Sequence, residues 1–481
     1  MRILMATSEL HPYSKTGGLA DMVAALAKTL AQKGHRVGIV TPLYRGIRVK
    51  FPELRPFDWQ MALPLGGEII PAQVWTTEPV KGLTLYFVDR PEFFDRPGIY
   101  NENGADYADN AARFIFFSKA AVHLARYLPW APQILHIHDW QTGLVPMLVQ
   151  HQRLAEGWGK AVPVMLTIHN LAYQGVFGAE AFALANLPSD WFNTGTAEFH
   201  GALNLLKAGI ATADTITTVS PRYAREIMTE EFGCGLDGLL RHRAEVVHGV
   251  LNGVDYEEWN TEANPHLKFR YSARHLAGKT RNKTALQREL GLPVNARVPM
   301  FGSVTRLAEQ KGVDLLVPAL EEMLGHSMQF VLLGSGDGRY EHSLRSVARR
   351  HPQKVAVRFG YDHGLSHRIE AACDFLLMPS RFEPCGLNQM YSLRYGTVPI
   401  VRATGGLDDS VVDPSENKQE ATGIKFSEYS PAALTQALRK ALALYRSKPA
   451  LRKFRQQGMA ADFSWDATAA RYVRLYDGLL K

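Results

Sequence analysis

The sequence predicts an α/β protein built from two doubly wound domains, each with a parallel sheet covered by helices. Short apolar segments alternate with amphipathic segments along almost the whole chain, which is the pattern of parallel sheets connected by helices. The chain has 481 residues, more than one hydrophobic core usually organises. We therefore expect a first domain over residues 1–250, a second over residues 251–458 and a terminal segment over residues 459–481.

In the first half, several segments have the length and apolar character of buried strands. They lie at residues 2–7, 36–42, 134–139, 162–169, 215–220 and 246–253. Between the first two, residues 19–32 repeat apolar side chains at helical spacing and are followed by Gly34, which favours a helix end. The first half therefore begins as a strand, a helix and a second strand.

The second half repeats the alternation, with strands expected at residues 298–306, 328–336, 355–361, 374–380 and 398–406, each followed by a helix. Residues 255–283 are polar and contain no clear strand, so the two domains should meet near residues 250–290. Residues 464–481 form a predicted helix with one apolar face, which must pack onto another part of the protein.

The composition is that of a soluble globular protein, with 46% hydrophobic and 21% charged residues. No apolar run approaches the roughly 18 residues of a membrane span, and the first residues lack the features of a signal peptide. The three cysteines form no CxxC pair, which argues against disulfides and against a structural zinc site. We expect a cytoplasmic protein with no membrane partner.

The formal net charge of +7 indicates an anionic partner, and a sugar nucleotide fits that requirement as well as a nucleic acid does. The densest basic run, at residues 345–354, falls on a predicted helix, and we interpret it as a solvated helix face. We therefore expect no nucleic-acid partner. The sequence leaves the oligomeric state open.

Polar and glycine residues gather where the predicted strands end. In open α/β sheets, ligands bind beyond the carboxyl ends of the strands. Both predicted domains carry such loops. Two separate sites, one in each domain, would need fewer loops than the sequence contains. The economical arrangement is two domains that face each other across one cleft.

The stretch "SKTGGLADMV" from Ser14 and the stretch "RATGGLDDSV" from Arg402 share the motif Thr-Gly-Gly-Leu-x-Asp. Neither matches a dinucleotide fingerprint or a P-loop. A glycine pair before a helix is either a tight turn or an anion site, and Lys15 beside Gly17 and Gly18 favours an anion site. We expect the first turn to meet a distal phosphate and a sugar, and the second, with its own glycine pair, to hold a nucleotide. The alternative is coincidence.

Two further loops carry charge. The loop "VTRLAEQKG" places Arg306 and Lys311 between a strand and a helix, as a diphosphate clamp or an ordinary basic loop. The turn "RFEPCGL" places Glu383 before a helix that starts at Leu387. That carboxylate can hold sugar hydroxyls, or it can only complement the helix dipole. The helix start, with Gly386, can take a phosphate, and we interpret Cys385 as a packing residue.

Five more residues stand at or near predicted strand ends. Tyr361 either stacks on a base or packs in the core. His136 and His138 share a face of one strand, but no third ligand follows at a convincing spacing, so we reject a metal site there. Asp139 follows that strand, and His169 ends the next one, where it could hydrogen-bond to a sugar.

Taken together, "KTGGLADMV", "HDWQTGL", "TIHNLAYQG", "VLNGVD", "TRLAEQKG", "SRFEPCGLNQMYSLRYGT" and "TGGLDD" resemble the bacterial glycogen synthases, the ADP-glucose-dependent branch shared with plant starch synthases. The resemblance runs from Met1 to the terminal helix. It implies the GT-B fold and retaining transfer of glucose from ADP-glucose to the non-reducing end of an α-1,4-glucan such as glycogen. It also implies that no cofactor or metal takes part and that the last helix crosses back onto the first domain.

The resemblance also implies site roles. Arg306 and Lys311 match the pair that neutralises the departing diphosphate, and Lys15 and Gly18 match the turn at the distal phosphate and glucosyl unit. Glu383 matches the essential carboxylate of the glucose pocket. Tyr361 matches the aromatic residue that stacks on adenine. Three further residues match positions around the glucosyl unit: Asp139, His169 and Asn252.

The chain departs from related GT-B families where they carry a second Glu, because Tyr391 stands there, as in the glycogen synthase branch. Asn388 stands where the family often has Thr. Two other functions stay open: a retaining glycosyltransferase that uses a UDP-sugar, and a non-catalytic glucan-binding homologue. The intact set of Lys15, Arg306, Lys311 and Glu383 argues against the second.

Overall fold

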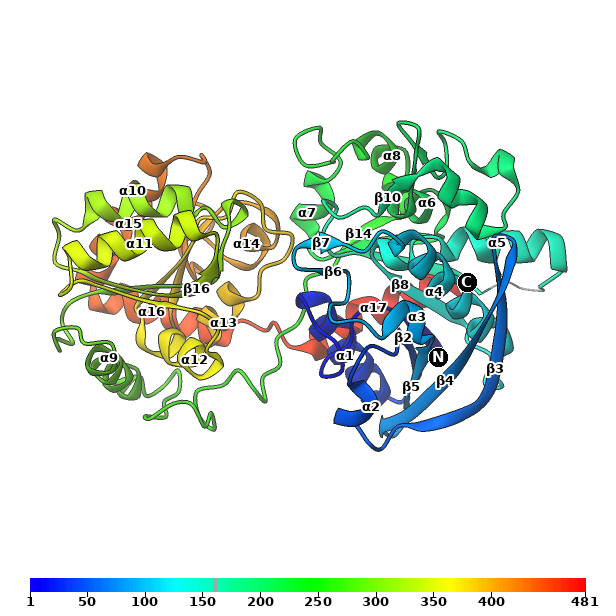
Figure 1. Cartoon of the computed structure of the whole chain (residues 1–481). Coiled ribbons are helices and arrows are strands. Elements are labelled where there is room, and N and C mark those ends of the chain that lie inside the picture. The colour runs from blue at the N-terminus through cyan, green and yellow to red at the C-terminus, as the bar shows by residue number, and fades with distance from the viewer. Residues whose placement is uncertain (159–161) are drawn as a thin grey trace. The chain divides into compact units, whose positions relative to one another are not determined.

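The computed structural model describes residues 1–158 and 162–481 (Figure 1). The chain divides into two compact units. The first unit contains Met1–Val219, Ala224–Val250 and Trp465–Lys481, and the second contains Ser220–Tyr223 and Leu251–Ser464. Each unit is built on one large sheet with helices packed against it.

The first unit has a nine-stranded sheet in the order β14-β13-β9-β8-β1-β2-β5-β4-β3. Its parallel part is β14 (Val247–Gly249), β13 (Thr215–Thr218), β9 (Val164–Ile168), β8 (Ile134–His138), β1 (Arg2–Ala6), β2 (Arg36–Pro42) and β5 (Leu83–Asp89). In the register of the central strands, Ile3 of β1 lies between Val37 and Ile134. The strand order reverses between the parallel neighbours β1 and β8: the strands after β1 add on one side and those after β8 on the other. The carboxyl ends of these two strands are therefore the expected place for a ligand.

The antiparallel edge of this sheet was not predicted. Strands β3 (Arg55–Leu65) and β4 (Glu68–Val80) pair with each other, and β4 pairs with β5. Short strands also form a three-stranded sheet, β10 (Val176–Gly178), β12 (Ala202–Asn204) and β11 (Glu198–Phe199), and a hairpin, β6 (Asn101–Glu102) with β7 (Ala105–Asp106). Strands β3 and β4 alternate between buried and exposed residues, so they lack the continuous apolar run of a parallel strand.

The longer helices of the first unit are α1 (Gly18–Gln32), α4 (Asn110–Tyr127), α5 (Val145–Glu156), α6 (Leu205–Thr212) and α17 (Trp465–Leu479). The shorter ones are α2 (Ile47–Lys50), α3 (Pro91–Phe94) and α8 (Asp237–His242), whereas α7 (Pro221–Glu226) belongs to the second unit up to Tyr223 and to the first from Ala224. Helix α1 ends as predicted, with Gly34 at φ +86° just beyond it. The terminal helix α17, red in Figure 1, packs on α1, and an ion pair of 2.6 Å joins Lys33 to Asp466.

The second unit has a six-stranded parallel sheet in the order β17-β16-β15-β18-β19-β20. Its strands are β15 (Met300–Leu307), β16 (Gln329–Gly336), β17 (Val355–Phe359), β18 (Phe375–Met378), β19 (Val398–Arg402) and β20 (Ile424–Phe426). All but the short β20 were predicted. The strand order reverses between the parallel neighbours β15 and β18, which makes this the switch point of the sheet. The carboxyl ends of these two strands are therefore the expected ligand position in this unit.

Helices cover both faces of the second sheet: α9 (Ala277–Glu289), α10 (Val313–Met323), α11 (Gly338–Arg350), α12 (His363–Ala372), α13 (Asn388–Arg394), α14 (Gly405–Ser410), α15 (Pro431–Arg446) and α16 (Lys448–Ala460). Helix α13 begins one residue later than expected. The terminal segment begins later too, because α16 continues to Ala460 and α17 starts at Trp465.

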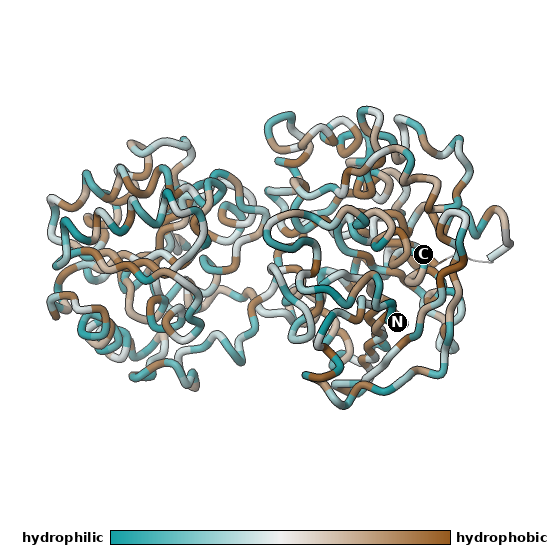
Figure 2. The backbone as a smooth tube through the Cα atoms, viewed as in Figure 1, coloured by the Kyte–Doolittle hydropathy of each residue, from teal (hydrophilic) through white to brown (hydrophobic). Residues whose placement is uncertain are grey.

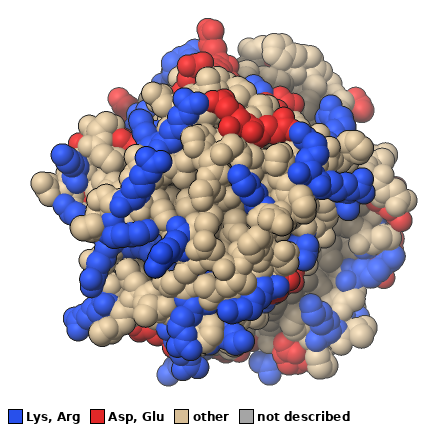
Figure 3. All heavy atoms as spheres, turned by 90° about the vertical axis from the view of Figure 1, so that its left-hand side faces the viewer, with Lys and Arg blue, Asp and Glu red and all other residues tan. Residues whose placement is uncertain are grey.

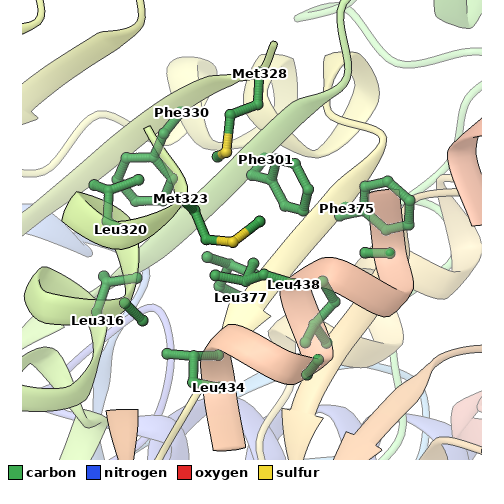
Figure 4. Packing of buried hydrophobic residues seen from close by; sticks show 14 of the residues in the cluster. Phe301, Leu316, Leu320, Met323, Met328, Phe330, Phe375, Leu377, Leu434 and Leu438 are labelled. Atoms are coloured by element: carbon green, nitrogen blue, oxygen red, sulfur yellow. The ribbon is translucent and has the colours of Figure 1, made fainter. Parts of the chain in front are cut away.

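The core of the second unit lies between its sheet and helices α10 and α15 (Figure 4). Phe301, Phe330 and Phe375 from three adjacent strands meet Leu320 and Leu438 from these helices, and all five are buried. Full burial of such a side chain contributes about 1.5–3 kcal/mol. In Figure 2 the strands inside each unit are mainly brown and the outer helix faces are teal, as expected for apolar strands covered by amphipathic helices.

Figure 3 shows Lys and Arg side chains spread over the visible face of the second unit, with uncharged and acidic residues between them. The basic run on α11 is part of this surface. Arg350 pairs with Glu321, and Arg345 lies over the ring of Phe359. This is the solvated helix face that the charge pattern predicts. Among the described residues, no helix is both long and apolar enough to cross a membrane.

Candidate active site

A cavity of about 200 Å³ lies at the switch point of the second sheet. It is lined by the carboxyl ends of β15 and β18, by Lys311, and by the turn from Glu383 to Asn388. Arg306, Lys311, Glu383, Gly386 and Leu387 were all predicted site residues. The structure brings them together although they come from two loops more than 70 residues apart, because neighbouring parallel strands end at one edge.

The central contact of this cavity is an ion pair. Lys311 Nζ lies 2.5 Å from Glu383 Oε2, and only 17% and 8% of the two side chains are exposed. The hydroxyl of Ser380 donates to the same oxygen at 3.0 Å. Arg306 also lines the cavity but is more exposed, with a long contact of 3.5 Å to the side chain of Gln310. In this cavity the carboxylate of Glu383 is therefore fixed by Lys311 and Ser380, whereas the guanidinium of Arg306 faces solvent.

The backbone of the Glu383 turn rests on the second Gly-Gly pair. A Cβ atom on Gly405 would lie 2.0 Å from the carbonyl oxygen of Glu383, and one on Gly406 would lie 2.0 Å from that of Cys385. The N–H of Gly406 donates to the carbonyl oxygens of Glu383 and Pro384, both at 3.1 Å. This corrects the expectation for Gly406, whose N–H is used inside the protein and is not presented to a nucleotide.

Cys385 lies in this turn but has the character of a packing residue. Its side chain is buried, and burial raises the pKa of the thiol to about 12, partly offset by a hydrogen bond from the backbone N–H of Asn252. Cys385 does not line the cavity, whereas Gly386 and Leu387 do. The side-chain oxygen of Asn252 is buried and has no hydrogen-bond partner among the described residues, so it is available to a hydroxyl donor.

Tyr361 is 88% exposed just beyond β17, which removes the core-packing interpretation. Beside it lies a second cavity of about 350 Å³, lined among others by Leu333, Phe359, Gly360 and Asp362. An aromatic ring held at a strand end with a free face is suited to stacking on a base.

In the first unit, the Gly-Gly turn after β1 is held by a residue that sequence analysis missed. The carboxylate of Glu9, which is buried, accepts hydrogen bonds from the N–H of Thr16 at 2.5 Å, from its hydroxyl at 2.6 Å and from the N–H of Gly17 at 3.1 Å. Tyr100 donates its hydroxyl at 2.8 Å to Glu9 Oε1, the oxygen that also accepts from the Thr16 hydroxyl, whereas both backbone N–H groups donate to Oε2. A lone acid between a strand and a turn gives no sequence signal.

The space beside this turn is open. A Cβ atom on Gly17 or Gly18 would meet nothing within 4 Å, so the backbone can be approached closely. Lys15 forms an exposed pair with Asp21 of α1, with Nζ 2.7 Å from Oδ2 and 2.8 Å from Oδ1. The lysine is therefore positioned at the start of α1 by the same motif that contains the glycines.

Asp139 and His169 meet at the carboxyl ends of β8 and β9. The backbone N–H of His169 donates to Asp139 Oδ1 at 2.7 Å. Burial raises the pKa of Asp139 to about 7, with a smaller rise from Glu9, against hydrogen bonds from the N–H groups of His169 and Asn170. Burial lowers the pKa of His169 to about 3, so its ring is neutral near pH 7. His138 Nδ1 lies 3.2 Å from His169 Nε2.

His136 has a structural position. Its Nδ1 lies 2.8 Å from the hydroxyl of Tyr476 on α17, and its Nε2 lies 2.7 Å from the hydroxyl of Thr167 on β9. Both ring nitrogens are therefore engaged by protein groups, and the residue joins the terminal helix to the sheet.

The two departures from related families also have structural explanations. Tyr391 stacks on Trp259, with ring centroids 3.7 Å apart and planes 4° apart, and does not line the cavity. Asn388 does line it, and its side-chain N–H donates to the carbonyl oxygen of Val304 at 2.5 Å. The first position is used for packing and the second to join the two loops of the cavity.

Comparisons with known proteins agree along the whole chain. The family described as starch synthase catalytic domain matches residues 2–242, and the family described as glycosyl transferases group 1 matches residues 289–459. A glycogen synthase of Anaeromyxobacter dehalogenans is 49% identical over 477 residues, which cover 99% of this chain and 98% of that protein.

Two solved structures are similar as well. The catalytic domain of starch synthase IV from Arabidopsis thaliana, bound to ADP and acarbose, matches with a TM-score of 0.88 at 34% identity, covering 100% of this chain and 99% of that one. A sucrose-phosphate synthase from Thermosynechococcus elongatus matches with a TM-score of 0.62 at 18% identity, covering 99% and 98% of the two chains, which shows a shared fold alone.

Proposed function

The chain belongs to the family of glycogen and starch synthases, glycosyltransferases of the GT-B fold, and on that premise we propose that it transfers glucose from ADP-glucose to an α-1,4-glucan. In this reaction the bond between the glucosyl carbon and the phosphate oxygen breaks and ADP leaves. A new α-1,4 bond forms to the 4-hydroxyl oxygen at the non-reducing end of the acceptor, with retention at the glucosyl carbon, and the proton of that hydroxyl leaves with ADP or to solvent. We assign the reaction to the cytoplasm and to protein groups without a metal or cofactor.

The observation that carries this proposal is the buried pair of Lys311 and Glu383 beside Arg306 at the switch point of the second sheet. Breaking the glucosyl–phosphate bond develops negative charge on ADP. Cations that are already in position stabilise that charge without reorganisation during the reaction. Arg306 can bind a phosphate in a fork, and Lys311 acts as a point charge.

Glu383 has two roles in this proposal. Its carboxylate holds the ammonium of Lys311 at a fixed place, and it accepts hydroxyl hydrogen bonds from the glucosyl unit. Ser380 fixes the oxygen that contacts Lys311, which leaves the other carboxylate oxygen for sugar. Gly386 and Leu387 contribute backbone at the wall of the same cavity, and Asn252 accepts from a sugar hydroxyl.

The nucleotide end of the donor is assigned to Tyr361, whose exposed ring stacks on adenine. The related starch synthase IV was solved with ADP and acarbose, a nucleotide and an oligosaccharide-like ligand. That pair of ligands supports a nucleotide-sugar donor and a glucan acceptor for this chain.

The first unit supplies the other contacts in the proposal. Lys15, Gly17 and Gly18 bind the distal phosphate and the sugar at the open face of their turn. Asp139 and His169 hydrogen-bond to the glucosyl unit, with His169 neutral near pH 7.

Glucose incorporation into glycogen, measured with radiolabelled ADP-glucose and UDP-glucose in parallel, tests the proposal. We expect incorporation from ADP-glucose to exceed that from UDP-glucose by at least about tenfold in kcat/KM. A preference for UDP-glucose would make the chain a UDP-sugar-dependent transferase. Glucan binding without release of ADP would make it a non-catalytic homologue.

A further inference from the structure

Three imidazoles and a carboxylate converge in the second unit, away from the residues that line the proposed active site. His363 and His367 lie four residues apart on α12, so they share one face of the helix. Glu258 and His266 come from residues 251–276, which precede α9 and contain no helix or strand. None of the four lines the cavity at Lys311 and Glu383.

The ligand atoms have the separations of a metal site. His363 Nε2 lies 3.2 Å from His367 Nε2, and Glu258 Oε1 lies 3.0 Å from the first and 4.0 Å from the second. A ring nitrogen of His266 lies within 4.8 Å of those of both other histidines. Four ligands around a tetrahedral zinc ion, with bonds of about 2.0–2.1 Å, are about 3.3 Å apart. Two of the three separations among His363, His367 and Glu258 are close to this value, and the third is 4.0 Å. The ring nitrogen of His266 has to move closer to complete the set.

The protein holds the central ligand firmly. His367 is fully buried, and its ring stacks on Trp259 with centroids 3.9 Å apart. Its Nδ1 lies 2.8 Å from the hydroxyl of Tyr395, and the side-chain nitrogen of Asn264 lies 3.1 Å from the same Nδ1 and 2.9 Å from that hydroxyl. The metal-binding tautomer is the one in which Nδ1 donates its proton to Tyr395, because that tautomer leaves Nε2 free for a ligand bond. Such an outer hydrogen bond orients the histidines of known metal sites.

We propose that Glu258, His266, His363 and His367 bind one divalent transition-metal ion of the zinc class. Imidazole nitrogens with one carboxylate favour zinc over magnesium or calcium, which prefer oxygen ligands. On binding, the metal replaces any proton held between the ring nitrogens, and that proton goes to solvent. The site is structural in this proposal, because all its ligands are protein groups.

The proposed metal site lies between the start of α12 and the segment that precedes α9. Helix α12 begins at His363, two residues after the exposed ring of Tyr361. The other two ligands lie in the segment that follows the boundary between the two units at Leu251. The metal would therefore fasten that segment to the start of α12. This inference does not depend on the proposed transferase activity.

Binding of Co²⁺ to the full chain tests the inference, because tetrahedral Co²⁺ has intense visible absorption. The protein is prepared without a polyhistidine tag and treated with chelator to remove bound metal. Every variant, including the parent, also contains Cys234→Ser, which removes the exposed thiol. We expect one Co²⁺ per chain, displaced by Zn²⁺. In His363→Asn the apparent affinity should fall by about 10–100-fold or more, while His326→Asn, at an exposed histidine outside the cluster, should bind as the parent does.

A second measurement separates metal binding from loss of fold. Zn²⁺ should raise the unfolding temperature of the parent and of His326→Asn, but not that of His363→Asn or Glu258→Gln. Absence of the absorption at millimolar Co²⁺ would overturn the inference, and so would binding that is unchanged in His363→Asn. In either case the four residues form only a hydrogen-bonded cluster.

Discussion

The two Thr-Gly-Gly-Leu-x-Asp turns share a sequence and a place after a strand, but they differ in what surrounds them. A side chain at Gly17 or Gly18 would enter empty space, whereas one at Gly405 or Gly406 would collide with backbone carbonyls 2.0 Å away. The first turn is open to a ligand on its outer side. The second is filled by the turn that carries Glu383.

The hydrogen bonds repeat this difference. Gly17 donates its N–H to a side-chain carboxylate, that of Glu9, whereas Gly406 donates to the backbone of Glu383 and Pro384. The same Gly-Gly sequence therefore leaves room for a ligand in the first unit, and in the second unit it lets the turn that carries Glu383 pack closely against it. Glycine pairs in a sequence identify a close approach, but only the fold identifies what approaches.

The largest effect is expected where the second turn supports chemistry. Replacing Lys311 with Ala should lower kcat by roughly 10²–10³-fold, because the charge on ADP grows in the transition state. Arg306→Ala should act in the same direction. The measurement is steady-state glucose transfer, with Lys418→Ala as the matched control at an exposed lysine. A raised KM with unchanged kcat would contradict the role.

The next prediction concerns the contact between the second turn and Glu383. A methyl group in Gly406→Ala must displace the backbone of Cys385, so we expect kcat to fall by roughly 10²-fold and the unfolding free energy to fall by about 1–3 kcal/mol. Gly338→Ala, where nothing lies within 4 Å, is the matched control. If both variants behaved as the parent does, the second turn would not position Glu383.

A third prediction concerns pH in the first unit, where Glu9 holds the open turn and lies near Asp139. Burial raises the pKa of Asp139 to about 7 in the folded protein, above its ordinary value of 3.8. The folded state thus keeps a proton that the unfolded state loses. The stability contributed by this group is complete below about pH 4 and is lost as the pH rises to about 7, by up to about 1.4 kcal/mol per pH unit.

Urea unfolding of the parent and of Asp139→Asn between pH 4.5 and 8 measures this contribution. The difference between the two curves should decline over that range and then level off. Glu9→Gln should move the midpoint to lower pH, because it removes a negative charge near Asp139. A difference independent of pH would show that Asp139 is ionised throughout.

The smallest effect is expected at the open turn itself. Gly18→Val should leave the unfolding temperature almost unchanged, because the added side chain meets no atom, yet it should lower kcat/KM by about tenfold by blocking the ligand. Thermal unfolding and glucose transfer measured on one preparation provide the two readouts. Normal kcat/KM in this variant would leave the first turn with a structural role only.

Residues that depend on local pattern were predictable, and those that depend on distant pairing were not. Most of the parallel strands, α1 and the cavity residues Lys311 and Glu383 follow from apolar runs and from the rule that strand ends meet. The parallel strands β5 and β20 were not predicted. Strands β3 and β4 were missed because only one face of each is buried. Glu9 was missed because its partners are backbone N–H groups and hydroxyls that give no sequence pattern, one of them from the distant Tyr100. Glu258 and His266 were missed because tertiary folding alone brings them to α12.

The hydrogen bond between His136 and Tyr476 joins the sheet of the first unit to a helix made from the last residues of the chain. Tyr472 and Tyr476 are fully buried in that unit. The second unit is therefore, in topological terms, an insertion into the first. During synthesis the first unit stays incomplete until α17 leaves the ribosome, whereas all of the second unit precedes that helix and is available to fold earlier. Damage to α17 consequently falls on the unit that was begun first.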